Sequence, residues 1–136
     1  MVTGANLRAL VAAAVMTAAV PAIALAHRGS TSPRLVGNPN AGKPLFVSTC
    51  GLCHRLKDAK TVGTIGPDLD KVTLTQPVIA KAITYGGSSV MTKAQVAKYP
   101  TQMVAYKNVL SKKQIQDIAA YVYKATHPAV YVSTTP

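Results

Sequence analysis

The chain has 136 residues and carries 15 Lys and Arg against 4 acidic residues, a formal net charge of +11. Its length fits one small domain. Its 49% apolar and 14% charged residues make it too hydrophobic for a disordered polybasic chain. Two cysteines are too few for a domain held together by many disulfides. We therefore expect a packed, basic domain that is stabilised by something other than cross-links.

Residues 1–26 predict an export signal. Arg8 is their one charge, and the uncharged run that follows ends in Ala24-Leu25-Ala26, which is typical of a signal-peptidase site. The run is also near the lower length limit for a membrane span, so an uncleaved anchor is the alternative. Cleavage after Ala26 is favoured. It would place the protein in the periplasm or at the outer face of the cytoplasmic membrane, with an excess of ten positive charges in residues 27–136.

Residues 27–40 are rich in Gly, Pro, Ser and Asn and predict a linker. A domain is expected over residues 41–125, followed by a tail from 126 to 136. It should begin with a short helix from Ala41 to Cys50. Pro44 should lie near the start of this helix, because proline is costly further inside.

Residues 57–74 contain Gly63, Gly66 and Pro67 and predict a loop of the length that usually wraps a ligand or carries function. Thr75 then predicts the N-cap of a second helix, which Gly86-Gly87 ends.

The last part of the domain predicts one helical turn around Lys93 to Lys98 and then a longer helix. Ser111 and Gln114 form a capping box for this helix, whose apolar period continues to about Ala125. No alternating run is long enough to predict a sheet. The fold class is therefore all-α, with short helices and long loops, and the helices alone cover too few residues for a convincing core.

Cys50, Cys53 and His54 form a Cys-x-x-Cys-His motif that contains both cysteines of the chain. In a helical turn the positions i, i+3 and i+4 lie on one face, so the three side chains can point the same way. This pattern indicates covalent attachment of haem, with two thioether bonds to the macrocycle and a histidine on the iron.

The motif has two other interpretations. A dithiol for disulfide exchange normally follows a strand, and none is predicted before Cys50. A structural zinc site needs four ligands, and the candidates beyond the motif are His27 and His127, near the two ends of the mature chain.

Four ordered motifs resemble the monohaem class I cytochromes c, over about Gly42 to Lys124. These are Gly42-Lys43-Pro44-Leu45-Phe46, Gly66-Pro67-Asp68-Leu69, Met103-Val104-Ala105-Tyr106 with Leu110-Ser111, and Gln114-Ile115 through Ala119-Ala120-Tyr121-Val122. The resemblance implies a small cytochrome c fold wrapped around one covalent haem.

The resemblance also implies roles for particular residues. Cys50 and Cys53 would form the thioethers, and His54 would be the proximal iron ligand. The carbonyl of Pro67 would accept a hydrogen bond from the other ring nitrogen of His54, and Met103 would be the distal ligand. Phe46 and Tyr121 would pack where the first and last helices cross.

The distal ligand has alternatives. Met91 lies in the same stretch as Met103, although the spacing to Leu110-Ser111 favours Met103. Val104 stands where the family usually has a proline after the ligand. His127 could in principle give bis-histidine ligation, but a cationic side chain after a helix is an ordinary surface feature.

A haem iron held by His and Met has no open position, so the expected function is single-electron transfer rather than catalysis. Leu45, Ile79, Ile83 and Leu110 are expected to bury the macrocycle. The alternatives are a haem peroxidase or ligand sensor with an open distal site, a haem-free dithiol protein, and a subunit of a larger exported redox complex.

Lys57, Lys60, Lys93, Lys98 and Lys107 flank the segments expected around the haem. Their charge predicts electrostatic steering toward an acidic face on a redox partner such as a dehydrogenase or terminal oxidase. Export argues against nucleic acid as the physiological target, although so basic a protein would bind it non-specifically.

Overall fold

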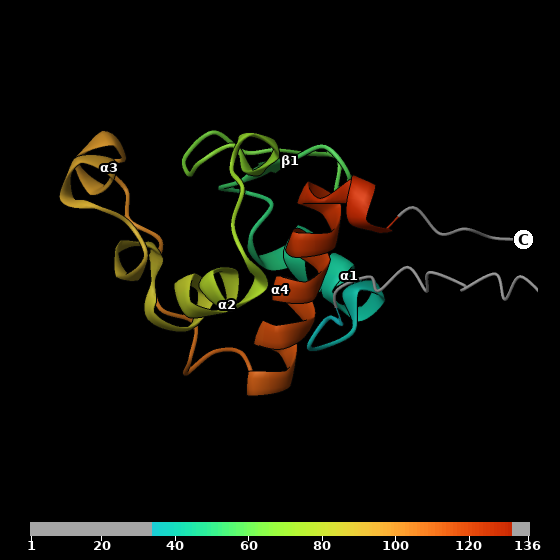
Figure 1. Ribbon diagram of the computed structural model, residues 1–136. Helices are drawn as coiled ribbons and strands as arrows, with labels where there is room; N and C mark the ends of the chain where they lie inside the picture. Colours follow the sequence, from blue (N-terminus) through green and yellow to red (C-terminus); the bar gives the residue numbers. More distant parts are fainter. Residues whose placement is uncertain (1–33, 132–136) are drawn as a thin grey trace, which may run out of the picture. The chain divides into compact units, whose positions relative to one another are not determined.

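Helices dominate the computed structural model, which describes residues 34–131 (Figure 1). In chain order the elements, with η for a 3-10 helix, are α1 (Pro39–Thr49), β1 (Arg55–Leu56), β2 (Thr61–Val62), η1 (Leu69–Lys71), α2 (Gln76–Tyr85), η2 (Gly87–Ser89), α3 (Lys93–Lys98), α4 (Lys112–Thr126) and η3 (Pro128–Tyr131). The prediction of a small, mostly helical domain is confirmed.

Some predictions concern residues that the structure does not describe. The export signal over 1–26, the first half of the linker (27–33) and the last five residues of the tail lie outside the described range. Within residues 34–131, no helix is long and apolar enough to cross a membrane.

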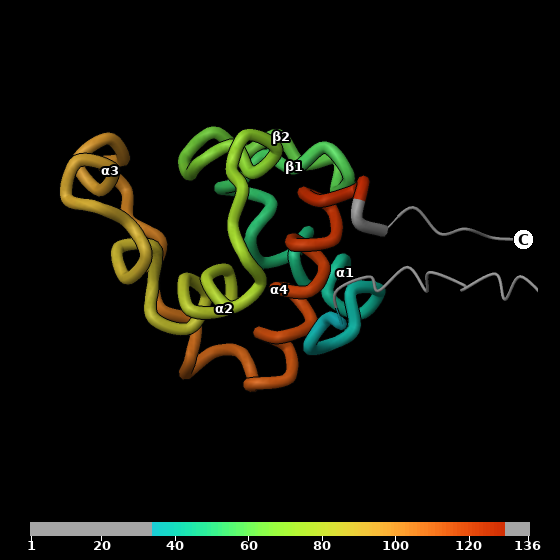
Figure 2. The backbone as a smooth tube through the Cα atoms, viewed as in Figure 1, coloured from blue at the N-terminus to red at the C-terminus, as the bar shows by residue number. Residues whose placement is uncertain are grey.

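A small antiparallel pairing of β1 with β2 was not predicted (Figure 2). Its register joins Arg55 to Val62 and Leu56 to Thr61. Strands of two residues are too short to show an alternating pattern in the sequence, which explains why periodicity did not reveal them.

The first helix begins at Pro39, two residues before the predicted start at Ala41. The Asn38 side chain caps it by accepting hydrogen bonds from the amides of Asn40 and Ala41. Pro44 therefore lies inside the helix, and the prediction that it lies near the start is wrong. Its side chain is exposed, and it lacks the amide that would bond the carbonyl of Asn40.

The other helices have the ends that the sequence predicted. α2 follows Thr75 and ends at Gly86, whose φ of +92° turns the chain out of the helix. α3 covers the predicted turn and begins with an unpredicted capping box between Thr92 and Gln95. The predicted capping box opens α4, which ends one residue beyond Ala125.

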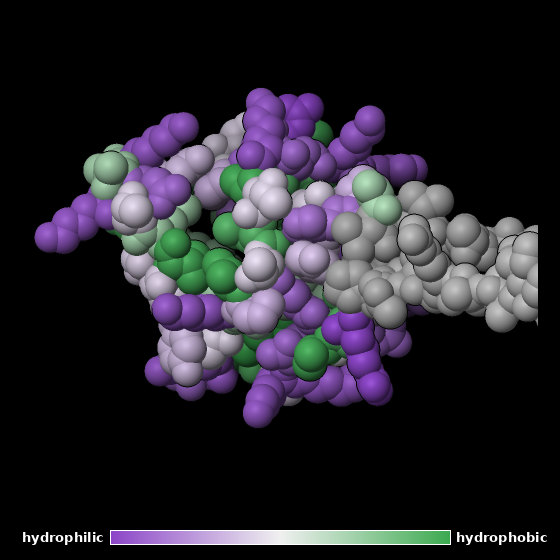
Figure 3. Space-filling view, in the orientation of Figure 1, coloured by the Kyte–Doolittle hydropathy of each residue, from purple (hydrophilic) through white to green (hydrophobic). Residues whose placement is uncertain are grey.

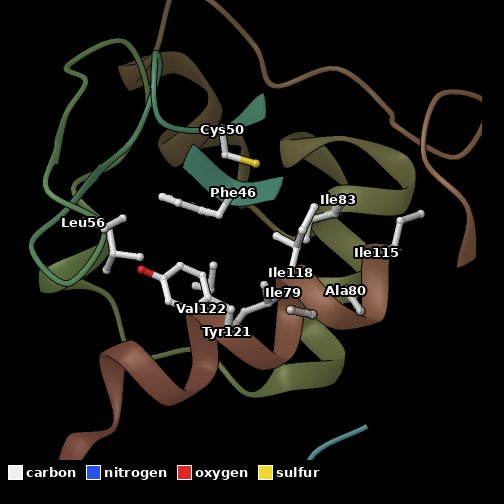
Figure 4. Packing of buried hydrophobic residues seen from close by; sticks show 12 residues of the cluster. Phe46, Cys50, Leu56, Ile79, Ala80, Ile83, Ile115, Ile118, Tyr121 and Val122 are labelled. Atoms are coloured by element: carbon white, nitrogen blue, oxygen red, sulfur yellow. The ribbon is translucent and has the colours of Figure 1, made fainter. Parts of the chain in front are cut away.

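The core lies between α1, α2 and α4 (Figure 4). Gly42 of α1 lies directly against the backbone of α4, because a Cβ at this position would overlap the carbonyl group of Asp117. Further along the crossing, the rings of Phe46 and Tyr121 meet as the resemblance implied, with centroids 5.6 Å apart and planes tilted by 59°. Burial of these rings and of Ile118 joins the two helices.

Part of the predicted linker is fixed to this core. The amide of Val36 donates to Gln76 Oε1 of α2, and the amide of Asn38 donates to Asp117 Oδ1 of α4 at 2.8 Å. Lys113 forms an ion pair with the same carboxylate at 2.7 Å. Burial alone would raise the pKa of Asp117, but the bonds from Lys113 and Asn38 lower it.

Residues 88–102, called here the α3 arm, project from the end of α2. Figures 1 and 2 both show α3 standing apart from α1 and α4. The arm returns to the domain at Met103, which packs against the core.

Candidate functional site

The Cys-x-x-Cys-His motif forms a turn at the end of α1. The amides of Cys53 and His54 both donate to the carbonyl of Cys50, at 3.1 and 2.9 Å. This turn gives the i, i+3, i+4 arrangement that the spacing predicted. All three side chains line the same cavity.

Within the described residues no disulfide joins Cys50 to Cys53, and Cys50 is buried. Burial, and to a smaller extent the nearby Cys53, raises the pKa of Cys50 to about 11. The motif follows a helix, whereas the dithiol of an exchange protein follows a strand and has a thiol with a lowered pKa. The local structure therefore differs from that expected for disulfide exchange.

The zinc interpretation gains no support from the described part of the chain. Residues 34–131 contain no group of three or more His, Cys, Asp or Glu side chains placed to hold a metal ion. His127 lies 2.9 Å from the carbonyl of Tyr123 through its Nδ1 and stacks on the Tyr123 ring. His27, the other candidate ligand, lies outside the described residues.

The His54 ring is held in one orientation. Its Nδ1 lies 2.9 Å from the carbonyl oxygen of Pro67, which is the contact that the resemblance implied. Because a carbonyl can only accept, Nδ1 carries the proton and Nε2 is the nitrogen able to bind a metal. Gly66 permits this packing, since a Cβ there would lie 2.5 Å from His54 Cε1.

The cavity beside the motif has a volume of about 360 Å³, within the range of about 300–1,000 Å³ typical of cofactor sites. Figure 3 shows apolar residues gathered around a hollow on this face, with hydrophilic side chains toward its edges. The predicted Ile79 and Ile83 line it, joined by Leu69, Val72, Leu74, Ile118 and Val122. Leu45 and Leu110, also predicted to do so, pack against the core instead.

These residues fit a covalently bound haem. Two thiols and an imidazole enter one apolar cavity from a single turn, and the imidazole has one nitrogen free for iron. Gly66 leaves room for the His54 ring to take this position. The cavity also explains how a domain with so few core residues could be stabilised, because a bound macrocycle would add apolar surface to its interior.

Both candidate distal residues, Met103 and Met91, line the cavity. Met103 also packs against the hydrophobic core, and its carbonyl accepts a hydrogen bond from the amide of Gly87 at 3.1 Å. Met91 lies in a bend of the α3 arm and is not among the described residues that pack against this core.

The α3 arm supplies part of the cavity wall, through side chains that the sequence did not single out. Gln95, Tyr99 and Gln102 line the cavity, and Gln102 also donates to the carbonyls of Val96 and Tyr99 at the end of α3. The spacing of Thr92 and Gln95 was the available signal for an ordered helix here.

A match to a known protein family agrees with this geometry. A sequence model described as cytochrome c matches residues 39–126. The crystal structure of the c-type cytochrome SorU from Sinorhizobium meliloti is similar at 25% identity and a TM-score of 0.47, covering 65% of this chain and 90% of that one. A comparison with curated proteins found no match.

Proposed function

The chain belongs to the cytochrome c family, and we propose that it carries single electrons between redox partners through one haem c. Membership and the motif together imply a haem bonded to Cys50 and Cys53. We assign His54 and Met103 as the two protein ligands of its iron.

The observation that supports this proposal best is the convergence of the motif on one apolar cavity. Cys50, Cys53 and His54 meet there, and the cavity is lined mainly by aliphatic side chains. When bound, the haem would supply a one-electron couple between ferric and ferrous iron.

The chain's own residues would support that couple in three ways. The Pro67 carbonyl holds the His54 ring and increases its basicity. Residues such as Ile79, Ile83 and Ile118 exclude water from the cavity. Met103 would occupy the remaining iron position and keep oxygen or peroxide from binding there.

The test begins with the protein isolated from cells that attach haem. We expect an intact mass increased by one haem and a pyridine haemochrome spectrum of the c type. A colourless chain whose two thiols can be alkylated would contradict the proposal and favour the haem-free dithiol alternative.

The distal ligand is tested with the paired variants Met103→Ala and Met91→Ala. The ferric protein should show the near-infrared charge-transfer band of Met-ligated haem. This band should disappear in Met103→Ala and persist in Met91→Ala. Absence of the band in the unaltered protein, with immediate binding of cyanide, would instead favour a peroxidase or ligand sensor.

We further propose that the physiological partner presents an acidic face, as a dehydrogenase or terminal oxidase could. Three of the four aspartates, Asp58, Asp68 and Asp117, form ion pairs with other lysines. The fourth, Asp70, accepts from the backbone amide of Lys57 and offsets at most one of the positive charges near the cavity. The lysines expected around the haem are exposed and belong to those that form no ion pair within residues 34–131: Lys57, Lys60, Lys93, Lys98 and Lys107.

Two small oxidants of opposite charge test the field around the site. The rate of oxidation by anionic ferricyanide should fall as ionic strength rises, because salt screens the attraction. The rate with cationic tris(phenanthroline)cobalt(III) should rise. Rates that do not change with salt would contradict electrostatic steering.

Export to the periplasm or the outer membrane face is proposed from residues 1–26. N-terminal sequencing of the haem-loaded protein should begin at His27. A membrane-bound product that begins at Met1 would favour the uncleaved anchor.

A further inference from the structure

We propose that Gly86 and Gly87, at the end of α2, are positioning residues that hold the main chain of Met103 and thereby slow the release of its sulfur from iron. The inference rests on the proposed function, because it takes Met103 as the distal ligand.

Reciprocal hydrogen bonds join the Met103 segment to the end of α2. The amide of Gly87 donates to the carbonyl of Met103 at 3.1 Å, and the amide of Tyr106 donates to the carbonyl of Ile83 at 2.9 Å. If α2 continued, Ile83 would accept from Gly87. The segment thus provides partners for two groups that the end of the helix leaves unpaired.

The conformation of Gly86 allows these two hydrogen bonds to form. Its φ of +92° is in a region that side chains disfavour, and it turns the following amide away from the helix axis. A Cβ on Gly86 would also lie 2.8 Å from the carbonyl oxygen of Met103.

Gly87 also lies close to Met103, although its φ is not positive. A Cβ at this position would lie 3.1 Å from the Cβ of Met103, so alanine would displace the Met103 backbone by a few tenths of an ångström. Both glycines are buried. The two residues therefore leave the distal segment room to lie against the helix.

Apart from its packing against the core, Met103 has few other restraints in the described structure. The α3 arm precedes it and stands apart from α1 and α4 (Figure 2). Val104, which follows it, is 64% exposed and leaves the backbone freer than the proline usual in the family. By contrast, α2 is anchored in the core through Ile79 and Ile83, so the contact with Gly87 transmits the rigidity of the core to the ligand.

The experiment compares Gly87→Ala with the unaltered haem-loaded protein. Imidazole can bind ferric iron only after the Met sulfur leaves, so its binding rate at saturation reports that release. We expect Gly87→Ala to raise this rate about five- to tenfold, the size of change associated with one ordinary hydrogen bond. Ser48→Gly, in the exposed part of α1, is the control: it should lower stability without changing the rate.

A second measurement needs no variant. In the unaltered protein, the amide protons of Gly87 and Tyr106 should exchange faster with solvent once imidazole has displaced Met103, whereas that of Gly86, bonded to Ala82 inside the helix end, should not. An unchanged imidazole rate in Gly87→Ala would overturn the inference, as would unchanged exchange at both amides. If the near-infrared band is present in the unaltered protein and lost in Met103→Ala, such a result leaves the proposed function standing.

Discussion

Replacing Gly42 with alanine tests whether close backbone contact joins α1 to α4. A Cβ at this position would overlap the carbonyl group of Asp117 and lie 2.9 Å from the amide nitrogen of Ile118. These are backbone atoms in the middle of α4, so they cannot rotate aside. The two helices would have to separate by about 1 Å, a gap that forfeits up to about half of the dispersion energy of each contact across it.

The affected contacts include the packing of Phe46 against Tyr121. Overpacking of this kind costs about 3 kcal/mol. Alanine regains about 1 kcal/mol through its higher helix propensity. The net loss of about 2 kcal/mol corresponds to a fall in Tm of roughly 8–16 °C for a domain of this size.

Thermal unfolding of the haem-loaded protein, followed by far-ultraviolet circular dichroism, measures this change. Ser48→Ala is the matched control, because Ser48 is exposed on the same helix and its replacement should change stability by less than about 0.5 kcal/mol. A Gly42→Ala protein that melts at or above the temperature of the unaltered protein would refute the reasoning, since helix propensity would then outweigh the contact.

Three further changes test other parts of the fold. Asp117→Asn should cost about 2 kcal/mol at neutral pH by removing a buried, charge-assisted acceptor. Since folding lowers the pKa of Asp117, its contribution is present above pH about 4 and is lost as the pH falls through the folded-state pKa, so urea unfolding should give converging stabilities in acid. Tyr121→Phe should cost about 1 kcal/mol in urea unfolding, because the hydroxyl donates to Asp58 Oδ1 at 2.7 Å. Pro44→Ala should raise stability by about 1–2 kcal/mol in thermal unfolding, because it restores an amide inside α1.

Each of these changes has an outcome that would contradict it. A stability deficit of Asp117→Asn that stays constant down to pH 2 would mean that the charge of the carboxylate contributes nothing. For Tyr121→Phe, the same loss in a protein that already carries Asp58→Ala would exclude the hydrogen bond as its cause. Pro39→Ala is the control for Pro44→Ala, because proline is tolerated at the first position of a helix. Equal gains in stability from Pro39→Ala and Pro44→Ala would contradict the argument that proline is costly only inside the helix.

The Cys-x-x-Cys-His motif was readable from the sequence because its spacing is a local property. Cys50, Cys53 and His54 need only one helical turn to reach the same face, and no distant residue is required to bring them together. The same holds for the ends of α2 and α4, where Gly86 and the pair Ser111 and Gln114 act within a few residues of the backbone groups they serve. Interactions between residues so close in the chain can be predicted from the sequence alone.

Tertiary structure decided what depends on neighbours far along the chain. The backbone before α1 is fixed by a bond from the amide of Asn38 to Asp117, a partner 79 residues away. Leu45 and Leu110 have the hydrophobicity of cavity residues but do not line the cavity, while Val72 and Leu74, from the predicted loop, do. The contact of Gly87 with Met103 likewise joins two segments whose sequences contain no sign of each other. A sequence shows which side chains can be buried or can bind a metal, but the packing of distant segments decides which of them meet.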